Sequence, residues 1–196
     1  MQYYIYSLVC FLLPGTVWLI WNKGMIADKA YKVRHIIWIY IYLFYGYLAV
    51  QEAAGIGTIW DLIAYGKLDN SINLIPISSE GAMTYILNII MFMPFGFLLP
   101  LIWKNFRNAK KVVLMGFLMS LAIEICQLFN IRTTDIDDLL MNTLGTLVGY
   151  CCWKVFSLIF RNAGTKCVEM KKSEPVIYMF GGILGLFLLY NWRLFD

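Results

Sequence analysis

Long apolar runs separated by short polar connections dominate the chain. Each run approaches the roughly 20 residues that a helix needs to cross a hydrocarbon core of about 30 Å. Backbone groups in lipid must be satisfied within the spanning segment, and the alternation typical of a membrane barrel is absent, so these runs predict helices. The pattern predicts an all-α polytopic membrane bundle of about six transmembrane helices, at Tyr3–Trp21, His35–Ala54, Ala82–Trp103, Val112–Phe129, Asp138–Phe160 and Val176–Leu194.

One connection, residues 55–81, departs from this pattern because it is long and partly apolar. It contains "IWDLIAY" and "INLIPI", which are too short to cross a bilayer. We expect an interfacial or re-entrant segment here, and a loop covered by the bundle is the alternative. The chain has no Pro/Ser linker and no low-complexity tract. Residues 1–196 are therefore predicted to form a single integral membrane domain.

The composition is typical of a membrane protein and argues against several other classes of protein. The chain is 61% hydrophobic and 14% charged, against about 45–50% and about 25% in soluble domains. The net charge of +4 comes from short basic clusters between apolar runs, so nucleic-acid binding is not predicted. The five cysteines are odd in number and show no C-x-x-C pair, which argues against a disulfide framework or a zinc site.

The basic residues also predict an orientation. Thirteen of the sixteen lysines and arginines lie in or near the first, third and fifth connections between the predicted helices. Lysine and arginine favour the cytoplasmic side of a membrane protein. We therefore expect those connections to lie inside and both termini to be extracellular.

Polar residues interrupt the apolar pattern around the fourth and fifth predicted helices. Ser120, Glu124 and Gln127 are spaced by four and three residues, so they share one helical face. Asp138 and Asn142 form a similar stripe on the next helix, which must run antiparallel to the first. The two stripes are therefore predicted to face each other.

These stripes predict a polar pocket in the outer leaflet. Its expected layer consists of Asn88, Glu124, Gln127 and Asn142. A lid above this layer is expected from Arg132, Asp135, Asp137 and Asp138. Four carboxylates face one base in this group, so we predict incomplete neutralisation. The cofactor is unknown, and a divalent cation has weak support because Asp135 and Asp138 share a helix face from which Asp137 diverges.

Structural roles explain several of the same residues. Thr134 is a candidate N-cap, with Asp135 and Asp137 in the first helical turn. Asn88 and Asn142 are candidates for hydrogen bonds between helices. The "GTLVG" that follows Asn142 permits close helix packing. The single histidine, His35, lies at a basic membrane edge and is read as interfacial.

Four motifs in sequence order resemble a known family. They are "INLIPI", "NIIMFMPFGFLLPL", "SLAIEICQLF" and "RTTDIDDLLMNTLGTLVGY", which together span about residues 73–150. This combination resembles the VanZ-like membrane proteins. The resemblance implies a cell-envelope role at the bacterial plasma membrane, with low-level resistance to teicoplanin and related lipoglycopeptides. It supplies no catalytic assignments.

Three functions remain open from the sequence. The first is an envelope protein whose pocket binds a membrane lipid or lipid-linked wall precursor, with the lipoglycopeptide itself as a further candidate partner. The second is a membrane enzyme for a phospholipid or polyprenyl-phosphate-linked substrate, with Glu124 and Asp138 as candidate catalytic residues. The third is a small transporter or flippase, which is disfavoured because the acids collect on one side and nothing comparable is expected in the cytoplasmic half.

Overall fold

The computed structural model describes residues 2–25, 29–65, 72–77, 81–129, 134–160 and 171–195. Within these ranges the chain forms seven α-helices, which confirms the predicted all-α class. They are α1 (Gln2–Asn22), α2 (Lys29–Tyr47), α3 (Ile59–Tyr65), α4 (Ala82–Ile102), α5 (Ala109–Gln127), α6 (Ile136–Ile159) and α7 (Glu174–Leu189). Six of them coincide with the predicted runs, and α3 lies in the long connection. A π-helix, Leu48–Ala54, continues α2.

The helices differ in how well they meet the requirements of a membrane span. Three stretches are long and apolar enough by length and composition: Gln2–Asn22, Ala30–Gln51 and Ala82–Ile102. Helix α7 is apolar but shorter. The structure thus has several candidate spans, and the full set of six crossings stays a prediction.

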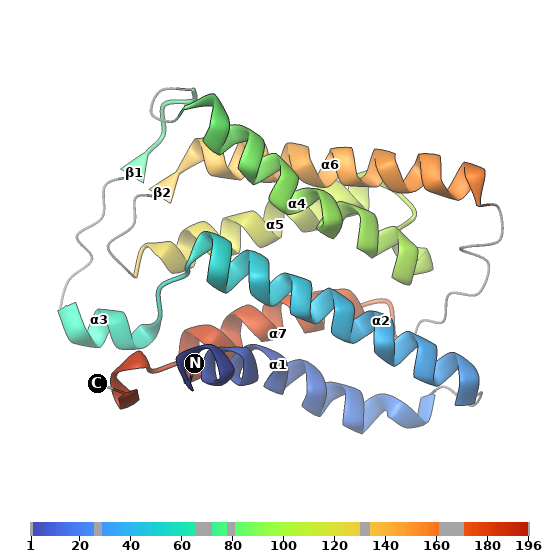
Figure 1. Cartoon of the computed structure of the whole chain (residues 1–196), viewed down its shortest axis with the longest axis horizontal. Coiled ribbons are helices and arrows are strands. Elements are labelled where there is room, and N and C mark those ends of the chain that lie inside the picture. Colours follow the sequence, from blue (N-terminus) through green and yellow to red (C-terminus); the bar gives the residue numbers. More distant parts are fainter. Residues whose placement is uncertain are drawn as a thin grey trace.

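The long helices lie side by side along the longest axis of the molecule (Figure 1). The pairs α4–α6, α1–α7 and α5–α6 make the most extensive contacts. Helix α3 and two short strands lie at the end where α4 and α6 begin and α5 finishes (Figure 1). We call this end of the bundle the polar end, because the polar residues discussed below gather there.

The two strands, β1 (Ile72–Asn73) and β2 (Thr134–Asp135), were not expected from the sequence. They pair in parallel, with Ile72 opposite Thr134 and Asn73 opposite Asp135. Two-residue strands carry no periodic signal, and their pairing joins segments about 60 residues apart. The pairing brings the long connection onto the start of α6.

The pairing also changes where α6 begins. Asp135 has extended backbone angles, and its side chain accepts a hydrogen bond from the Asp137 N–H at 2.9 Å. Asp135 is therefore the N-cap of α6, and the prediction of Thr134 as the cap is wrong. The reason is that pairing with β1 holds both Thr134 and Asp135 in strand conformation.

Helix α3 fastens the long connection to the rest of the bundle. Thr58 precedes its N-terminus, and the Thr58 hydroxyl accepts from the Asp61 N–H at 3.3 Å. The Asp61 carboxylate in turn accepts from the Thr58 N–H at 2.6 Å and from the Thr58 hydroxyl at 2.8 Å. The Trp60 Nε1–H donates to the Leu188 carbonyl of α7 at 3.1 Å. This part of residues 55–81 is thus packed on α7, while parts of the same connection lie outside the described residues.

Glycines set the spacing between α4 and α6. A Cβ added at Gly96, Gly145 or Gly149 would overlap main-chain atoms of the facing helix. The predicted close packing of "GTLVG" is confirmed, and its partner is α4. This near contact of two backbones positions the side chains at the polar end.

Candidate functional site

A layer of buried polar side chains crosses the bundle near the polar end. Glu124 is 5% exposed and Asn142 is 3% exposed, and Gln127 and Ser120 are also buried. The predicted stripes of α5 and α6 therefore face the interior. A buried carboxylate in an apolar bundle requires hydrogen-bond partners, because its desolvation is otherwise costly.

Glu124 fastens the end of α5 to the start of α6. Its Oε2 accepts from the Asp135 N–H at 3.2 Å, and its main-chain carbonyl accepts from the Thr134 hydroxyl at 3.4 Å. Asp135 in turn accepts from the Asn73 side-chain amide at 3.0 Å. One chain of hydrogen bonds thus runs from α5 through α6 to β1.

Asp137 is fully buried and holds the segment that follows β1. Its Oδ1 accepts from the Ile77 N–H at 2.7 Å, and its Oδ2 accepts from the Tyr85 hydroxyl of α4 at 2.8 Å. Asp138 points to a different partner, the side-chain amide of Asn88 on α4. Asn88 therefore joins the layer through Asp138.

Two members of the predicted lid, Asp135 and Asp137, are buried. Asp135 contacts Glu124 of the layer through its N–H. The third member, Asp138, is partly buried against Asn88. Arg132 lies outside the described residues, and the predicted charge imbalance stays a prediction.

The amides of the layer also bridge between elements. The Asn142 Nδ2–H donates to the Ser120 hydroxyl at 2.9 Å, and the Gln127 Nε2–H donates to the Ala54 carbonyl of the π-helix at 3.0 Å. The expected role of Asn88 and Asn142 in joining helices is confirmed by these bonds. However, the buried Asn142 Oδ1 accepts no hydrogen bond from any residue that the structure describes.

The donor set does not favour a resident cation. No group of three or more His, Cys, Asp or Glu side chains suited to a metal occurs among the described ranges. Both oxygens of Asp135 and of Asp137 accept hydrogen bonds from protein donors. The aspartates diverge toward separate partners, so they act here as hydrogen-bond acceptors.

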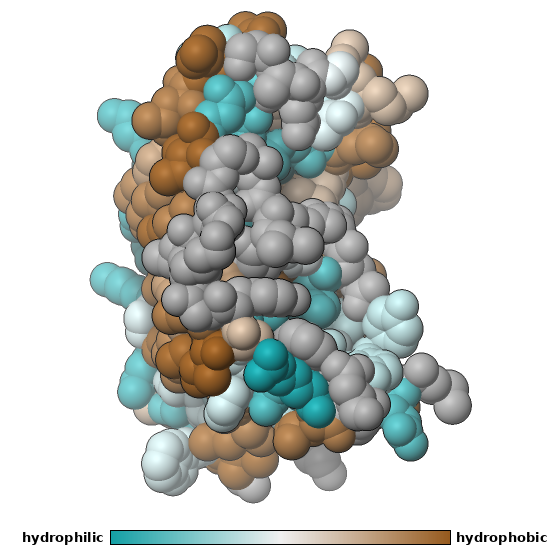
Figure 2. Space-filling view, turned by 90° about the vertical axis from the view of Figure 1, so that its left-hand side faces the viewer, coloured by the Kyte–Doolittle hydropathy of each residue, from teal (hydrophilic) through white to brown (hydrophobic). Residues whose placement is uncertain are grey.

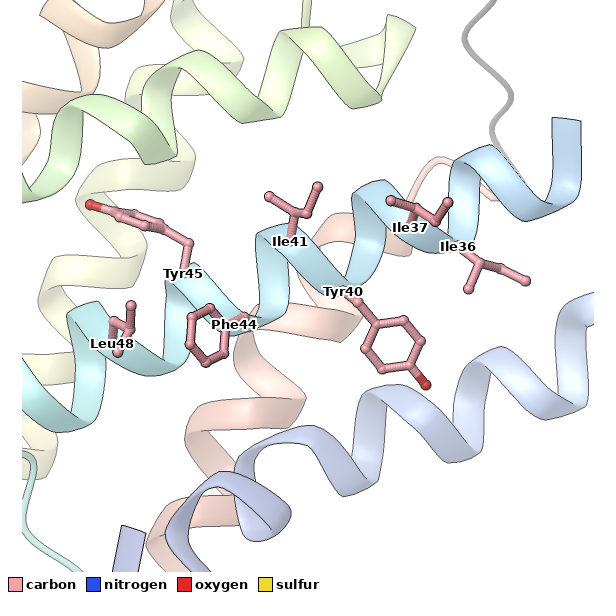
Figure 3. Close-up of a pocket in the computed structure, with 7 residues that line it drawn as sticks. All are labelled: Ile36, Ile37, Tyr40, Ile41, Phe44, Tyr45 and Leu48. Atoms are coloured by element: carbon pink, nitrogen blue, oxygen red, sulfur yellow. The ribbon is translucent and has the colours of Figure 1, made fainter. Parts of the chain in front are cut away.

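An apolar groove of about 590 Å³ follows α2 (Figure 3). Its lining is Ile36, Ile37, Tyr40, Ile41, Phe44, Tyr45 and Leu48. Tyr45 closes one side, and its hydroxyl donates to the Met91 carbonyl of α4. The groove runs along the helix for about 18 Å at 1.5 Å per residue, which is comparable to the ~15 Å half-thickness of a hydrocarbon core.

Comparison with known proteins assigns the chain to a family. The VanZ/LLP1 family model matches residues 4–157, which is most of the chain. The chain belongs to the VanZ/LLP1 family. It is also 34% identical to "Protein VanZ" of Enterococcus faecium over 134 residues, covering 67% of this chain and 77% of that protein. No solved structure matches it.

The match to the VanZ/LLP1 family confirms the resemblance drawn from the four motifs. It extends beyond the motif region, residues 73–150, and includes every residue of the polar layer. Helix α7 lies beyond the matched residues. The family assignment therefore bears on the polar layer, while features that depend on α7 are described for this chain alone.

A second buried polar cluster joins α2 to α7 near the end of the bundle opposite the polar end. His35 Nε2 lies 2.8 Å from Glu174 Oε1, and the Tyr178 hydroxyl donates to the same carboxylate oxygen at 3.2 Å. His35 is 5% exposed and Glu174 is fully buried. The packing of α7 encloses His35, whereas its position at the membrane edge stays a prediction.

Sequence reasoning missed Glu174 as a functional or structural residue. The available signal was weak: a glutamate directly before Pro175, at the start of an apolar run. The expectation that buried titratable groups are confined to one half of the VanZ-family bundle is also wrong. The His35–Glu174 pair lies in the other half.

Proposed function

We propose that this VanZ-family protein is a bacterial plasma-membrane protein whose polar layer binds the head group of a membrane lipid or lipid-linked wall precursor. Such binding would change how lipoglycopeptides meet the outer membrane surface, and it would give low-level resistance to teicoplanin. The polar end faces outward in this proposal, as the distribution of basic residues predicts.

The observation that carries the proposal is the unfilled acceptor in the layer. An unsatisfied polar atom at a buried position costs about 1–3 kcal/mol. Asn142 Oδ1 is such an atom within the described part of the chain. A hydroxyl or amide N–H of a bound head group supplies the missing donor, and both groups occur in lipids and in wall precursors.

Depth supports the same ligand class. Asn88 lies six residues into α4, or about 9 Å from its start. If α4 spans the membrane, this places the layer in the half of the bilayer at the polar end. The apolar groove along α2 offers a path for one acyl chain in the same direction.

Resistance assays with matched glutamate variants test the proposal. Glu124→Gln preserves shape and removes charge inside the layer, and Glu174→Gln makes the same change outside it. We expect the first to abolish teicoplanin protection at unchanged membrane abundance and the second to retain protection per folded molecule. Full protection by Glu124→Gln, or equal loss in both variants, contradicts the proposal.

Asn142 provides a second, independent test. Asn142→Leu removes the acceptor at similar volume, and Asn105→Leu changes a partly exposed asparagine in the 3₁₀ helix after α4. We expect only the first to reduce the amount of lipid or precursor that copurifies with the protein, as measured by mass spectrometry. Equal ligand recovery from both variants would remove Asn142 from the site.

An enzymatic role is the second candidate. It is favoured by the burial of Glu124 inside a hydrogen-bonded layer, which is the setting of many general acids and bases. In this role Asp138, which accepts a hydrogen bond from the Asn88 side chain, is the second proposed catalytic residue beside Glu124. Turnover predicts an altered lipid or precursor in cells that express the protein, whereas binding alone leaves the chemical composition unchanged.

A transporter or flippase is the third candidate. It is supported by the presence of buried titratable groups at both ends of the bundle, Glu124 and the His35–Glu174 pair. Movement of a labelled lipid between the leaflets of proteoliposomes would distinguish this role. If the labelled lipid binds but does not move between the leaflets, the result favours the first proposal, lipid binding without transport.

A further inference from the structure

The segment between β1 and α4 presents a compact set of apolar side chains. Leu74, Ile75 and Ile77 are 70%, 68% and 74% exposed, and Ile72 is also exposed. Figure 2 views the polar end directly and shows hydrophobic residues along its border beside hydrophilic ones. Several large aliphatic side chains exposed within six residues form a surface that water does not favour.

The hydrogen bonds of this segment place it beside the first turn of α4. Ile77 and Tyr85 bind the two oxygens of the same carboxylate, Asp137. Tyr85 lies about 5 Å along α4 from its start. Helix α4 is a candidate membrane span, and its neighbouring residues Met83 and Ile86 are exposed and apolar. The segment is thus level with a surface of α4 that suits lipid.

The segment is held in one conformation against backbone strain. Ile77 has φ of 60°, a left-handed conformation that β-branched residues rarely adopt. Such a conformation persists where surrounding contacts over-determine it. Here the fully buried Asp137 binds the Ile77 N–H, and Asn73 accepts from the Ile75 N–H at 3.2 Å while it donates to Asp135.

We propose that Leu74, Ile75 and Ile77 insert among the acyl chains of the leaflet at the polar end. Asp137 sets their depth by binding the Ile77 backbone. The occupant of this surface is bilayer lipid, because the surface continues the exposed apolar face of α4. The inference concerns contact with acyl chains and holds whether or not a head group binds in the polar layer.

This arrangement couples a lipid-facing surface to the buried carboxylates. The Asp137 carboxylate joins α6 to α4 and to the inserted segment through two hydrogen bonds. A displacement of the segment therefore acts directly on the first turn of α6, which also contains Asp138 and follows the N-cap Asp135.

Photo-crosslinking in native membranes tests insertion. p-Benzoylphenylalanine replaces Leu74 or Ile75, and mass spectrometry records adducts with lipid. Ile90, exposed on α4, is the positive control, and the exposed Lys172 is the negative control. We expect lipid adducts at Leu74 and Ile75 in yields comparable to that at Ile90.

Two other outcomes overturn insertion. An adduct at Ile90 without one at Leu74 or Ile75 shows that the segment lies in water. Adducts with another protein at these positions assign the surface to a partner. Lipid adducts at Leu74 and Ile75 that persist in a Glu124→Gln variant without teicoplanin protection separate this inference from the proposed head-group binding.

A matched pair at Ile77 tests the tether, with the crosslinker at position 75. Ile77→Gly removes the side chain but keeps the N–H and permits positive φ. Ile77→Pro removes the N–H and fixes φ near −65°. We expect the glycine variant to keep the yield of the lipid adduct. In the proline variant we expect this yield to fall roughly tenfold, the effect of losing one hydrogen bond to a charged group. Asp137→Asn is expected to reduce the yield in the same direction, and equal yields in all three variants overturn the tether.

Discussion

At the scale of single residues, neighbouring carboxylates have different tasks. Asp135 caps α6 and binds Asn73, Asp137 binds the Ile77 main chain and Tyr85, and Asp138 binds Asn88. Successive side chains at a helix start point in different directions, so adjacent acids reach separate elements. The "DIDD" sequence thus links α6 to three parts of the chain, and charge alone does not reveal this division.

The bond between Tyr85 and Asp137 gives a stability prediction. Tyr85→Phe removes one donor from a fully buried carboxylate. We expect the free energy of unfolding to fall by about 1.5–3 kcal/mol, the range for hydrogen bonds to charged groups. Denaturation in detergent micelles measures it. Tyr4→Phe at an exposed tyrosine is the control, and an equal change in both variants contradicts the assignment.

The His35–Glu174 pair predicts a non-additive pair of substitutions. Removing one member leaves a buried polar or charged group uncompensated, so His35→Ala is expected to destabilise the fold by about 3–5 kcal/mol. Replacing both by leucine removes the two buried polar groups together and is expected to recover most of this loss. A double-mutant cycle of unfolding free energies measures the coupling. Additive effects would show that the pair does not interact.

At the scale of elements, the close approach of α4 and α6 positions the side chains of the polar layer. Gly145 and Gly149 lie against main-chain atoms of α4, and Asn88 meets Asp138 one layer nearer the polar end. The sequence showed the small residues but suggested α5 as the partner of this helix. Helix α6 in fact contacts both neighbours, with Asn142 directed to α5 and the glycines to α4.

This packing predicts which glycines tolerate a methyl group. Gly149→Ala places a Cβ on the Met93 main chain, whereas the nearest neighbour of a Cβ at Gly181 is the Pro14 Cβ at 3.4 Å. We expect the first substitution to cost about 1–3 kcal/mol through overpacking and the second to be nearly neutral. Thermal unfolding in micelles measures both, and tolerance of Gly149→Ala would contradict the close approach.

At the scale of the whole molecule, the two ends of the bundle are chemically distinct. The polar end combines buried carboxylates and amides with an exposed apolar segment, and the opposite end carries the His35–Glu174 pair. Two of the basic clusters belong to connections at that opposite end: the connection after α1, which contains Gly24, and the connection after α4, which contains Lys104. This asymmetry is the physical basis of the proposed orientation.

Labelling of intact cells checks the orientation. A cysteine at exposed Gly24, with exposed Cys151 and Cys152 replaced by serine, is expected to resist a membrane-impermeant maleimide until the cells are opened. An epitope tag at the C-terminus is expected to be accessible from outside. The reverse pattern would place the polar layer in the cytoplasmic leaflet and contradict the proposed function.

The sequence by itself determined the helical class, the positions of six helices and the burial of Glu124, Gln127 and Asn142. These follow from apolar length and from helical spacing, which are local properties. The family motifs are local in the same sense. The N-cap of α6 was misassigned by one residue because strand pairing, a distant contact, overrode the local capping signal.

Only the tertiary structure decided which polar groups meet. The tether from Asp137 to Ile77 joins residues 60 apart, and the His35–Glu174 contact joins residues 139 apart. A sequence pattern gives the face on which a side chain lies, but it does not give the segment that covers that face. That choice depends on how the helices pack, and here the glycines of α4 and α6 and the placement of α7 made it.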